Sequence, residues 1–154
     1  MRVVLSQRGE LLTGVPAHQL SILQRVGVPT LAAEARLPHA DLLVDALIGY
    51  SLSGAPRSPV SSLIRAANAA GAPILALDVP SGLNGNRGTP YDPCITAAST
   101  LTLALPKAGL LEGAAATSVG DLYVADISVP NLVYDRIGVR VDPVFGRNDV
   151  VAVR

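Results

Sequence analysis

The sequence is poor in the residues that build covalent crosslinks and metal frameworks. Its 154 residues include one cysteine, Cys94, and two histidines, His18 and His39. A single cysteine excludes an internal disulfide and a cysteine-based zinc site, and the histidines do not have the spacing of metal ligands. The length is nevertheless sufficient to bury one substantial core, and we expect a single domain over residues 1–154.

Charge and long apolar runs are also scarce. Only 16% of the residues are charged, and 12 basic residues balance 12 acidic ones. Balanced charge gives no electrostatic footprint for nucleic acid or for an anionic membrane surface. No apolar run approaches the length that crosses a bilayer, and the run at residues 3–5 is too short for a signal peptide. The sequence therefore predicts a soluble, cytoplasmic protein that binds neither nucleic acid nor membrane.

What the sequence does contain is an alternation of short apolar runs and amphipathic segments. The pattern predicts helices at residues 16–26 and 59–70, a short helix after Pro130, and strands at residues 2–6, 42–48, 74–79, 100–105 and 122–127. Such alternation is typical of βαβ units and a parallel sheet. Residues 30–38 and the tail beyond Arg140 show no clear pattern.

Three of the predicted strands end at residues that could carry chemistry. Gly49 follows the second strand, Asp78 closes the third, and Lys107, the sole lysine, follows the fourth. Parallel strands place their carboxyl ends at one edge of the sheet, where ligands of open α/β sheets bind. We therefore expect these three segments to meet at one site.

The pentapeptide Asp-Val-Pro-Ser-Gly at residues 78–82 is the most informative of these segments. It places a carboxylate at the end of a buried strand, suited to proton transfer or to holding a cation. The same residues are also ordinary turn formers, since Asp and Ser bond their own backbone, Pro fixes φ and Gly allows positive φ. The pentapeptide alone leaves both interpretations open.

The other candidates have equally plain alternatives. The loop at residues 49–54 offers backbone amides and hydroxyls to an anion, or it is a simple βα connection, and it matches neither standard nucleotide motif. Asp45 interrupts an apolar strand and needs a partner, either a structural one or a bound ion. Lys107 could counter Asp78, hold an anion, or be plain surface. Ser81 lacks a nucleophile elbow, and Cys94 has no paired base.

Four segments together resemble the YjeF N-terminal domain, the NAD(P)H-hydrate epimerase family. They occupy residues 41–54, 77–83, 102–110 and 120–130, in the family's order and spacing. The resemblance implies a Rossmann-like three-layer α/β/α sandwich with a mainly parallel sheet. It also implies an isomerase that interconverts the R and S epimers of hydrated NADH and NADPH in nicotinamide nucleotide repair.

The resemblance implies roles for individual residues. Asp78 matches the family's acid/base group, and Lys107 matches a lysine of its pocket. Asp45 and Ser81 match ligands of a potassium ion. The dinucleotide would contact Asp78 and the glycine-bounded loop, which consists of Gly49, Tyr50, Ser51, Leu52, Ser53, Gly54 and Ala55.

The sequence departs from the family pattern at its start and at one further position. It contains no Gly-Asn-Asn-Gly-Gly-Asp-Gly loop, which in the family binds the substrate phosphates, and Asn84 stands where an aspartate is common. Without the family's first segment, a strand edge should lie uncovered. We therefore expect either a homo-oligomer or a missing N-terminal partner segment. A second interpretation is a catalytically silent module of the same fold, used for dimerisation or ligand binding.

Overall fold

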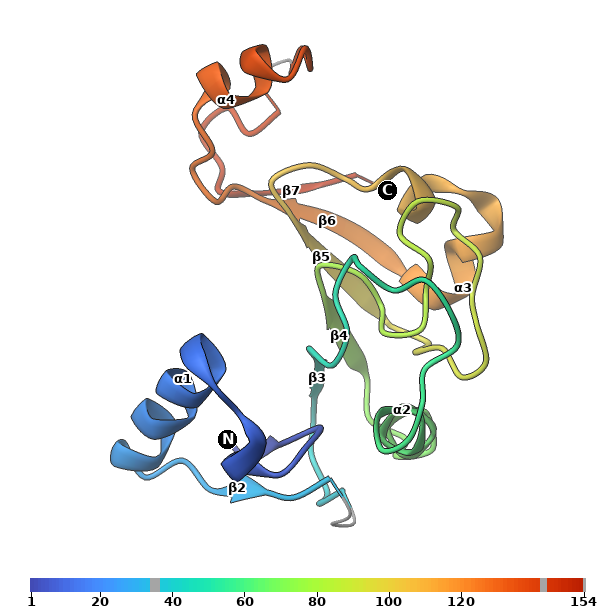
Figure 1. Ribbon diagram of the computed structural model, residues 1–154. Helices are drawn as coiled ribbons and strands as arrows, with labels where there is room; N and C mark the ends of the chain where they lie inside the picture. The colour runs from blue at the N-terminus through green and yellow to red at the C-terminus, as the bar shows by residue number, and fades with distance from the viewer. Residues whose placement is uncertain (34–36, 142–143, 154) are drawn as a thin grey trace.

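The computed structural model describes residues 1–33, 37–141 and 144–153. Within these residues, five strands form one sheet in the order β3-β4-β5-β6-β7, and β1 and β2 pair separately (Figure 1). Strands β3 to β6 are parallel, whereas β7 is antiparallel to β6. The strands are β1 (Val3–Val4), β2 (Thr30–Leu31), β3 (Leu43–Asp45), β4 (Ile74–Leu77), β5 (Ser99–Leu103), β6 (Asp121–Ala125) and β7 (Val150–Ala152).

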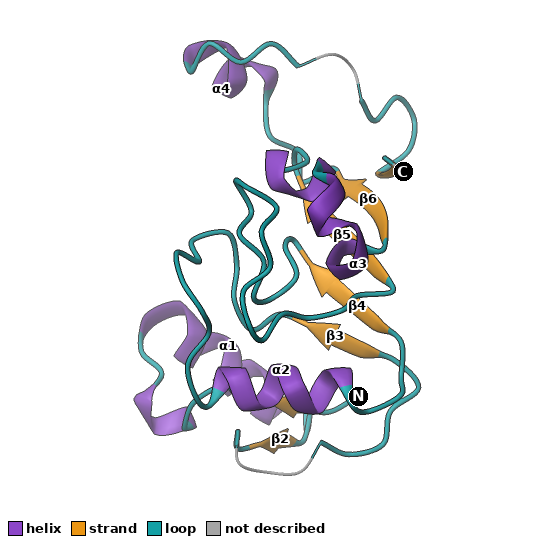
Figure 2. Ribbon diagram, turned by 90° about the vertical axis from the view of Figure 1, so that its right-hand side faces the viewer, coloured by secondary structure: helices purple, strands orange, loops and turns teal. Residues whose placement is uncertain are grey.

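Helices lie on both sides of the larger sheet. Figures 1 and 2 show α2 and α3 on one side and α1 on the other, while α4 stands away from the sheet. The α-helices are α1 (Gly14–Arg25), α2 (Val60–Asn68), α3 (Ala116–Val119) and α4 (Asn131–Arg136), and short 3-10 turns are η1 (Gly9–Leu11), η2 (Ala108–Leu111) and η3 (Gly113–Ala115). This arrangement confirms the predicted α/β class with a mainly parallel sheet.

The first half of the core forms under α2. The predicted amphipathic character of this segment is confirmed, because Leu63 and Ile64 are the buried residues of the helix. Ile64 packs in a cluster with the side chains of Ile74, Ala76, Ile95 and Ala97. These residues come from β4 and from the segment that leads into β5, so the cluster fixes α2 against the middle of the sheet.

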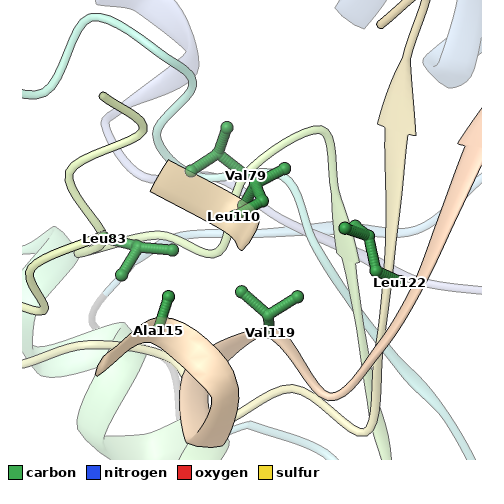
Figure 3. Close-up of a cluster of buried hydrophobic side chains, with 6 residues drawn as sticks. All are labelled: Val79, Leu83, Leu110, Ala115, Val119 and Leu122. Atoms are coloured by element: carbon green, nitrogen blue, oxygen red, sulfur yellow. The ribbon is translucent and has the colours of Figure 1, made fainter. Parts of the chain in front are cut away.

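The second half of the core lies under η2, η3 and α3. Figure 3 shows its side chains pointing toward one another, and every one of them is 1% exposed or less. Val79 and Leu83 belong to the turn after β4. The burial of their apolar side chains therefore holds this turn against the core. The cluster comprises Val79, Leu83, Leu110, Ala115, Val119 and Leu122.

The opposite face of the sheet is covered less completely. Val44 of β3 is 59% exposed and Leu77 of β4 is 39% exposed. The N-terminal segment with β1, α1 and β2 lies beside β3 in Figure 1 and does not continue the larger sheet. The sheet is therefore well packed at β4 to β6 and open at its β3 end.

The structure refines the predicted elements in three places. Each predicted strand is present but shorter, as at residues 42–48, where only Leu43–Asp45 is a strand. Residues 30–38, which showed no pattern, contain β2 (residues 34–36 lie outside the described residues), and the indistinct tail contains β7. Both missed strands are very short and pair with distant segments, so the local sequence gives little sign of them.

Candidate functional site

Strands β4 and β5 each end in a tight three-residue turn, and the two turns are of the same kind. The amide of Val79 donates to the carbonyl of Leu77 at 3.0 Å, across Asp78. The amide of Leu105 donates to the carbonyl of Leu103 at 2.8 Å in the same way. The residues at the centre of these turns have left-handed backbone angles, φ 69° at Asp78 and φ 64° at Ala104. Such three-residue turns are strained and cluster at functional sites, so they single out this edge of the sheet.

Asp78 is held there by Lys107. The Lys107 ammonium forms an ion pair with Oδ1 of Asp78, and the two side chains are 19% and 22% exposed. Lys107 Nζ also donates to Thr102 Oγ1 at 3.1 Å and to the carbonyl of Leu103 at 2.9 Å, which uses its three protons. The predicted meeting of Asp78 and Lys107 is thus confirmed as a contact.

The carboxylate of Asp78 is bound asymmetrically. Oδ1 accepts hydrogen bonds from Thr102 Oγ1 and from the Leu103 amide, each at 3.2 Å, in addition to that from Lys107. Among the hydrogen bonds of the described residues, none goes to Oδ2. One oxygen therefore fixes the position of the side chain.

A second pair links β3 to the turn after β4. Asp45 and Ser81 are 5% and 1% exposed. Ser81 donates its hydroxyl to Asp45 Oδ1 and its amide to Asp45 Oδ2, both at 2.7 Å. The amide of Leu47 adds a weaker bond to Oδ1 at 3.3 Å, and Ser81 Oγ accepts one from the Ile48 amide at 2.9 Å. The partner that Asp45 requires is therefore present within the protein.

Burial raises the pKa of Asp45 above its ordinary value, although the hydrogen bonds from Ser81 and Leu47 oppose this shift. In the part of the chain that the structure describes, no lysine or arginine forms an ion pair with Asp45. When ionised, the carboxylate carries a buried negative charge that dipoles alone stabilise. A bound cation would lower the free energy of this charge.

The long connection at residues 84–96 packs against residues 81 and 82 of the turn that follows β4. The amide of Ile95 donates to the carbonyl of Ser81, and that of Tyr91 to the carbonyl of Gly82, each at 2.9 Å. Gly82 has φ +100°, and a Cβ on it would lie 2.4 Å from the carbonyl oxygen of Pro93. Only glycine allows this close approach, which holds Ser81 against Asp45.

The glycine-bounded loop reaches the same edge. The phenol of Tyr50 hydrogen-bonds the side chain of Asn86, and a Cβ on Gly85 would lie 2.8 Å from the Tyr50 ring. Asn84 stabilises that segment by accepting amide hydrogen bonds from Asn86 and Arg87, both at 3.0 Å. The loop is mostly exposed, with Gly49, Tyr50, Ser51, Ser53 and Ala55 exposed and Leu52 and Gly54 half-buried.

The remaining candidates from the sequence lie outside this chemistry. Burial raises the pKa of the Cys94 thiol, which its hydrogen bond with Ser118 only partly offsets, so the thiol is a poor nucleophile. Neither His18 nor His39 takes part in a metal-ligating cluster among the described residues. The described residues also contain no helix that is long and apolar enough to span a membrane.

Sequence reasoning missed Thr102, which touches both Asp78 and Lys107. Its signal was available, because Thr100 and Thr102 alternate with apolar residues along β5 and both are fully buried. A buried hydroxyl needs a partner, so two threonines on one face of a strand indicate polar groups nearby. Asn86 had no comparable signal, since its role depends on Tyr50, which lies far from it in sequence.

Comparison with known families shows to which family the chain belongs. The family model for the YjeF-related protein N-terminus matches residues 1–109, which include Asp45, Asp78, Ser81 and Lys107. The chain belongs to the YjeF-related family. The resemblance seen in the sequence is thus confirmed, whereas the expectation that residues 1–154 form a single domain of this kind stays a prediction.

Two curated relatives of this YjeF-related chain carry names that bear on function. The NAD(P)H-hydrate epimerase of Dehalogenimonas lykanthroporepellens is 40% identical over 132 residues, covering 84% of this chain and 51% of the relative. The bifunctional NAD(P)H-hydrate repair enzyme Nnr of Salinibacter ruber is 35% identical over 152 residues, covering 88% and 28%. The chain thus spans about half the length of the first relative and less of the second.

A solved structure supports the fold. The crystal structure of yeast ynu0 matches with a TM-score of 0.75 and 21% identity, over 98% of this chain and 65% of that one. This agreement confirms the Rossmann-like α/β fold class for the YjeF-related chain.

Replacement of Gly82 tests how the turn is held. Gly82→Ala should destabilise the protein by at least about 2 kcal/mol, because it combines a left-handed backbone with a backbone clash. Gly113→Ala is the matched control, since a Cβ there meets nothing within 4 Å. Urea unfolding of both variants measures the difference. Equal stabilities would show that residues 84–96 do not pack on the turn as described.

Proposed function

We propose that this chain provides the epimerase site of an NAD(P)H-hydrate epimerase and interconverts the R and S epimers of hydrated NADH and NADPH. The names of the curated relatives support this reaction class. The observation that carries the proposal is the carboxylate of Asp78 at the carboxyl edge of β4, anchored through Oδ1 by Lys107. The substrate would be a hydrated nicotinamide dinucleotide, and the ligand edge of an open α/β sheet is a suitable place for it.

The reaction needs a group that can both donate and accept a proton next to C6 of the damaged ring. The hydroxyl at C6 of the damaged ring leaves as water after protonation, and water returns on the other face with loss of a proton. In our proposal Oδ2 of Asp78 exchanges these protons, because Oδ1 is occupied by three donors. A positioned acid/base contributes typically about 10²- to 10⁴-fold to a rate.

Lys107 has a positioning and electrostatic role in this scheme. Its three protons bond Asp78, Thr102 and the carbonyl of Leu103, so the ammonium is rigidly placed. It keeps the carboxylate at the end of β4 and would add positive charge at the edge of the sheet where we propose that a pyrophosphate-containing ligand binds. Most residues of the glycine-bounded loop from Gly49 to Ala55 are exposed, and in our proposal the loop offers backbone amides and the ring of Tyr50 for contact with the dinucleotide.

A potassium ion fits the chemistry of Asp45 and Ser81. Their carboxylate and hydroxyl are oxygen donors, which hard cations prefer. A monovalent cation would neutralise the buried charge of Asp45. In our proposal Asp45 and Ser81 would hold the ion, and the ion would supply positive charge at this edge of the sheet.

Epimer interconversion tests the proposed reaction. Pure R hydrate of NADH, incubated with the protein, should convert to a mixture of R and S hydrate faster than in buffer. Asp78→Asn should lower this rate by about 10²- to 10⁴-fold, because it removes the proton-exchanging oxygen. Chromatography of the two epimers gives the rate.

Asp121→Asn serves as the control, since Asp121 is an exposed carboxylate at the amino end of β6. It should leave the rate unchanged, and thermal melts should show that all three proteins are folded. An absence of conversion by folded wild type at high concentration would favour the silent module. Conversion that survives Asp78→Asn would remove Asp78 from the mechanism.

Thermal stability tests the cation site. A tenfold excess of KCl over its Kd stabilises a binding protein by about 1.4 kcal/mol, which for this size raises Tm by about 3–6 °C. We expect this rise for wild type in KCl relative to choline chloride. Asp45→Asn should abolish it, and Asp41→Asn, at an exposed aspartate outside the pair, should keep it. A rise that is equal in choline, or that survives Asp45→Asn, contradicts the assignment.

A further inference from the structure

The turn at residues 84–88 lies between two parts of the proposed site. It is closed by the amide of Gly88, which donates to the carbonyl of Asn84 at 2.8 Å. The side chain of Asn84 holds the turn from within, because its Oδ1 accepts the amides of Asn86 and Arg87, both at 3.0 Å. Gly88 is buried, whereas Asn86 is exposed. The turn therefore has a fixed shape, with a buried side and an exposed side.

The exposed side of the turn binds the glycine-bounded loop. The phenol of Tyr50 donates to Oδ1 of Asn86. The Tyr50 ring also lies against Gly85, where a Cβ would come within 2.8 Å of the ring. The loop follows β3 in the chain and the turn follows β4, so these contacts join two separate connections of the sheet.

The buried side of the turn packs against η2. The amide of Gly109 in η2 donates to the carbonyl of Gly85 at 2.9 Å. A Cβ on Gly109 would lie 2.5 Å from the amide nitrogen of Gly88 and 2.6 Å from the carbonyl oxygen of Gly85. These distances leave no room for a side chain, so the two backbones are in direct contact. Because packed interiors transmit displacement, a shift of the turn would also shift η2.

Lys107 directly precedes η2. The carbonyl of Lys107 accepts the amide of Leu110 at 2.9 Å, and Leu110 is fully buried. The ammonium of Lys107 bonds Asp78, after the end of β4, and Thr102 in β5. A continuous series of contacts therefore runs from Tyr50, through the turn and η2, to the ion pair.

We propose that the turn at residues 84–88 is a brace that sets the position of Lys107, and with it that of Asp78, relative to the glycine-bounded loop. Asn86 and Gly109 are its positioning residues, because each joins the turn to one of these two parts. The consequence for catalysis rests on the proposed function, in which the loop contacts the dinucleotide while Asp78 acts on C6 of its ring. A misplacement of about 1 Å between such groups can cost about 10²-fold in rate.

Acetylation of Lys107 tests the brace independently of the reaction. Lys107 is the only lysine of the chain, and its ammonium reacts slowly while Asp78 holds it. Trace acetic anhydride followed by peptide mapping measures its rate separately from that of the amino terminus. We expect Asn86→Ala to raise this rate at least threefold, because the turn then loses its bond to Tyr50. Asn148→Ala, at an exposed asparagine near the C-terminus, is the control and should leave the rate unchanged.

Two further variants separate positioning from a loss of structure. Asn86→Asp keeps an oxygen that accepts the phenol proton, and it should restore the acetylation rate to within twofold of wild type. Gly109→Ala tests the same path from the other side of the turn, and it should speed hydrogen exchange at the amides of residues 50–55 at least threefold. Gly113→Ala should not, since a Cβ there meets nothing within 4 Å.

Kinetics test the consequence for the proposed reaction. Asn86→Ala should lower kcat for epimer interconversion at least tenfold and change KM less than threefold, because the ligand contacts remain while the carboxylate is misaligned. An unchanged kcat in an active protein overturns the positioning role.

The exposed position of Asn86 keeps the test decisive even if Gly109→Ala does not fold. Equal acetylation of Lys107 in wild type and Asn86→Ala overturns the inference, and so does a failure of Asn86→Asp to restore the rate. If acetylation responds as expected but folded wild type does not interconvert the epimers, the brace stands and the proposed reaction fails.

Discussion

The hydrogen bonds between Asp45 and Ser81 join the end of one strand to the turn after the next. Both residues are buried, and the serine uses its hydroxyl and its amide to bind the two carboxylate oxygens. An aspartate inside an apolar strand would otherwise be costly. The bonds therefore stabilise the carboxylate and at the same time fix the position of the turn. The other features of the site depend on that turn.

The turn after β4 also orients Asp78. Gly82 allows residues 84–96 to pack against it, and Val79 and Leu83 anchor it in the apolar cluster below. Asp78 lies at the start of this turn, directly after β4, and has a strained backbone conformation. Strain of this kind persists only where surrounding contacts over-determine the geometry. Burial on one side and the Lys107 ion pair on the other provide these contacts.

Much of this arrangement could be predicted from the sequence because it depends on local pattern. Apolar runs marked β3, β4, β5 and β6, and parallel strands necessarily bring their carboxyl ends to one edge. That reasoning placed Asp78 near Lys107, and the resemblance to the YjeF family placed Asp45 with Ser81. Contacts within and between neighbouring βαβ units are therefore accessible from the sequence.

The rest depends on contacts between distant segments. The strands β2 and β7 are two and three residues long, and only their partners make them strands. The hydrogen bond between Tyr50 and Asn86 likewise joins two segments that lie far apart in the sequence, and no local pattern predicts it. Thr102 is intermediate, because its burial could have been inferred from the alternation in β5 but its partners could not.

The central claim is that Asp45 and Ser81 act as one unit that supports the site. A double-mutant cycle measures this directly, from the urea unfolding of wild type, Asp45→Asn, Ser81→Ala and the double variant. Residues in direct contact typically show coupling energies of about 0.5–3 kcal/mol, and we expect a value of at least about 1 kcal/mol for this doubly bonded, buried pair. Additive effects, with a coupling energy near zero, would show that the two residues do not support each other and would contradict the account.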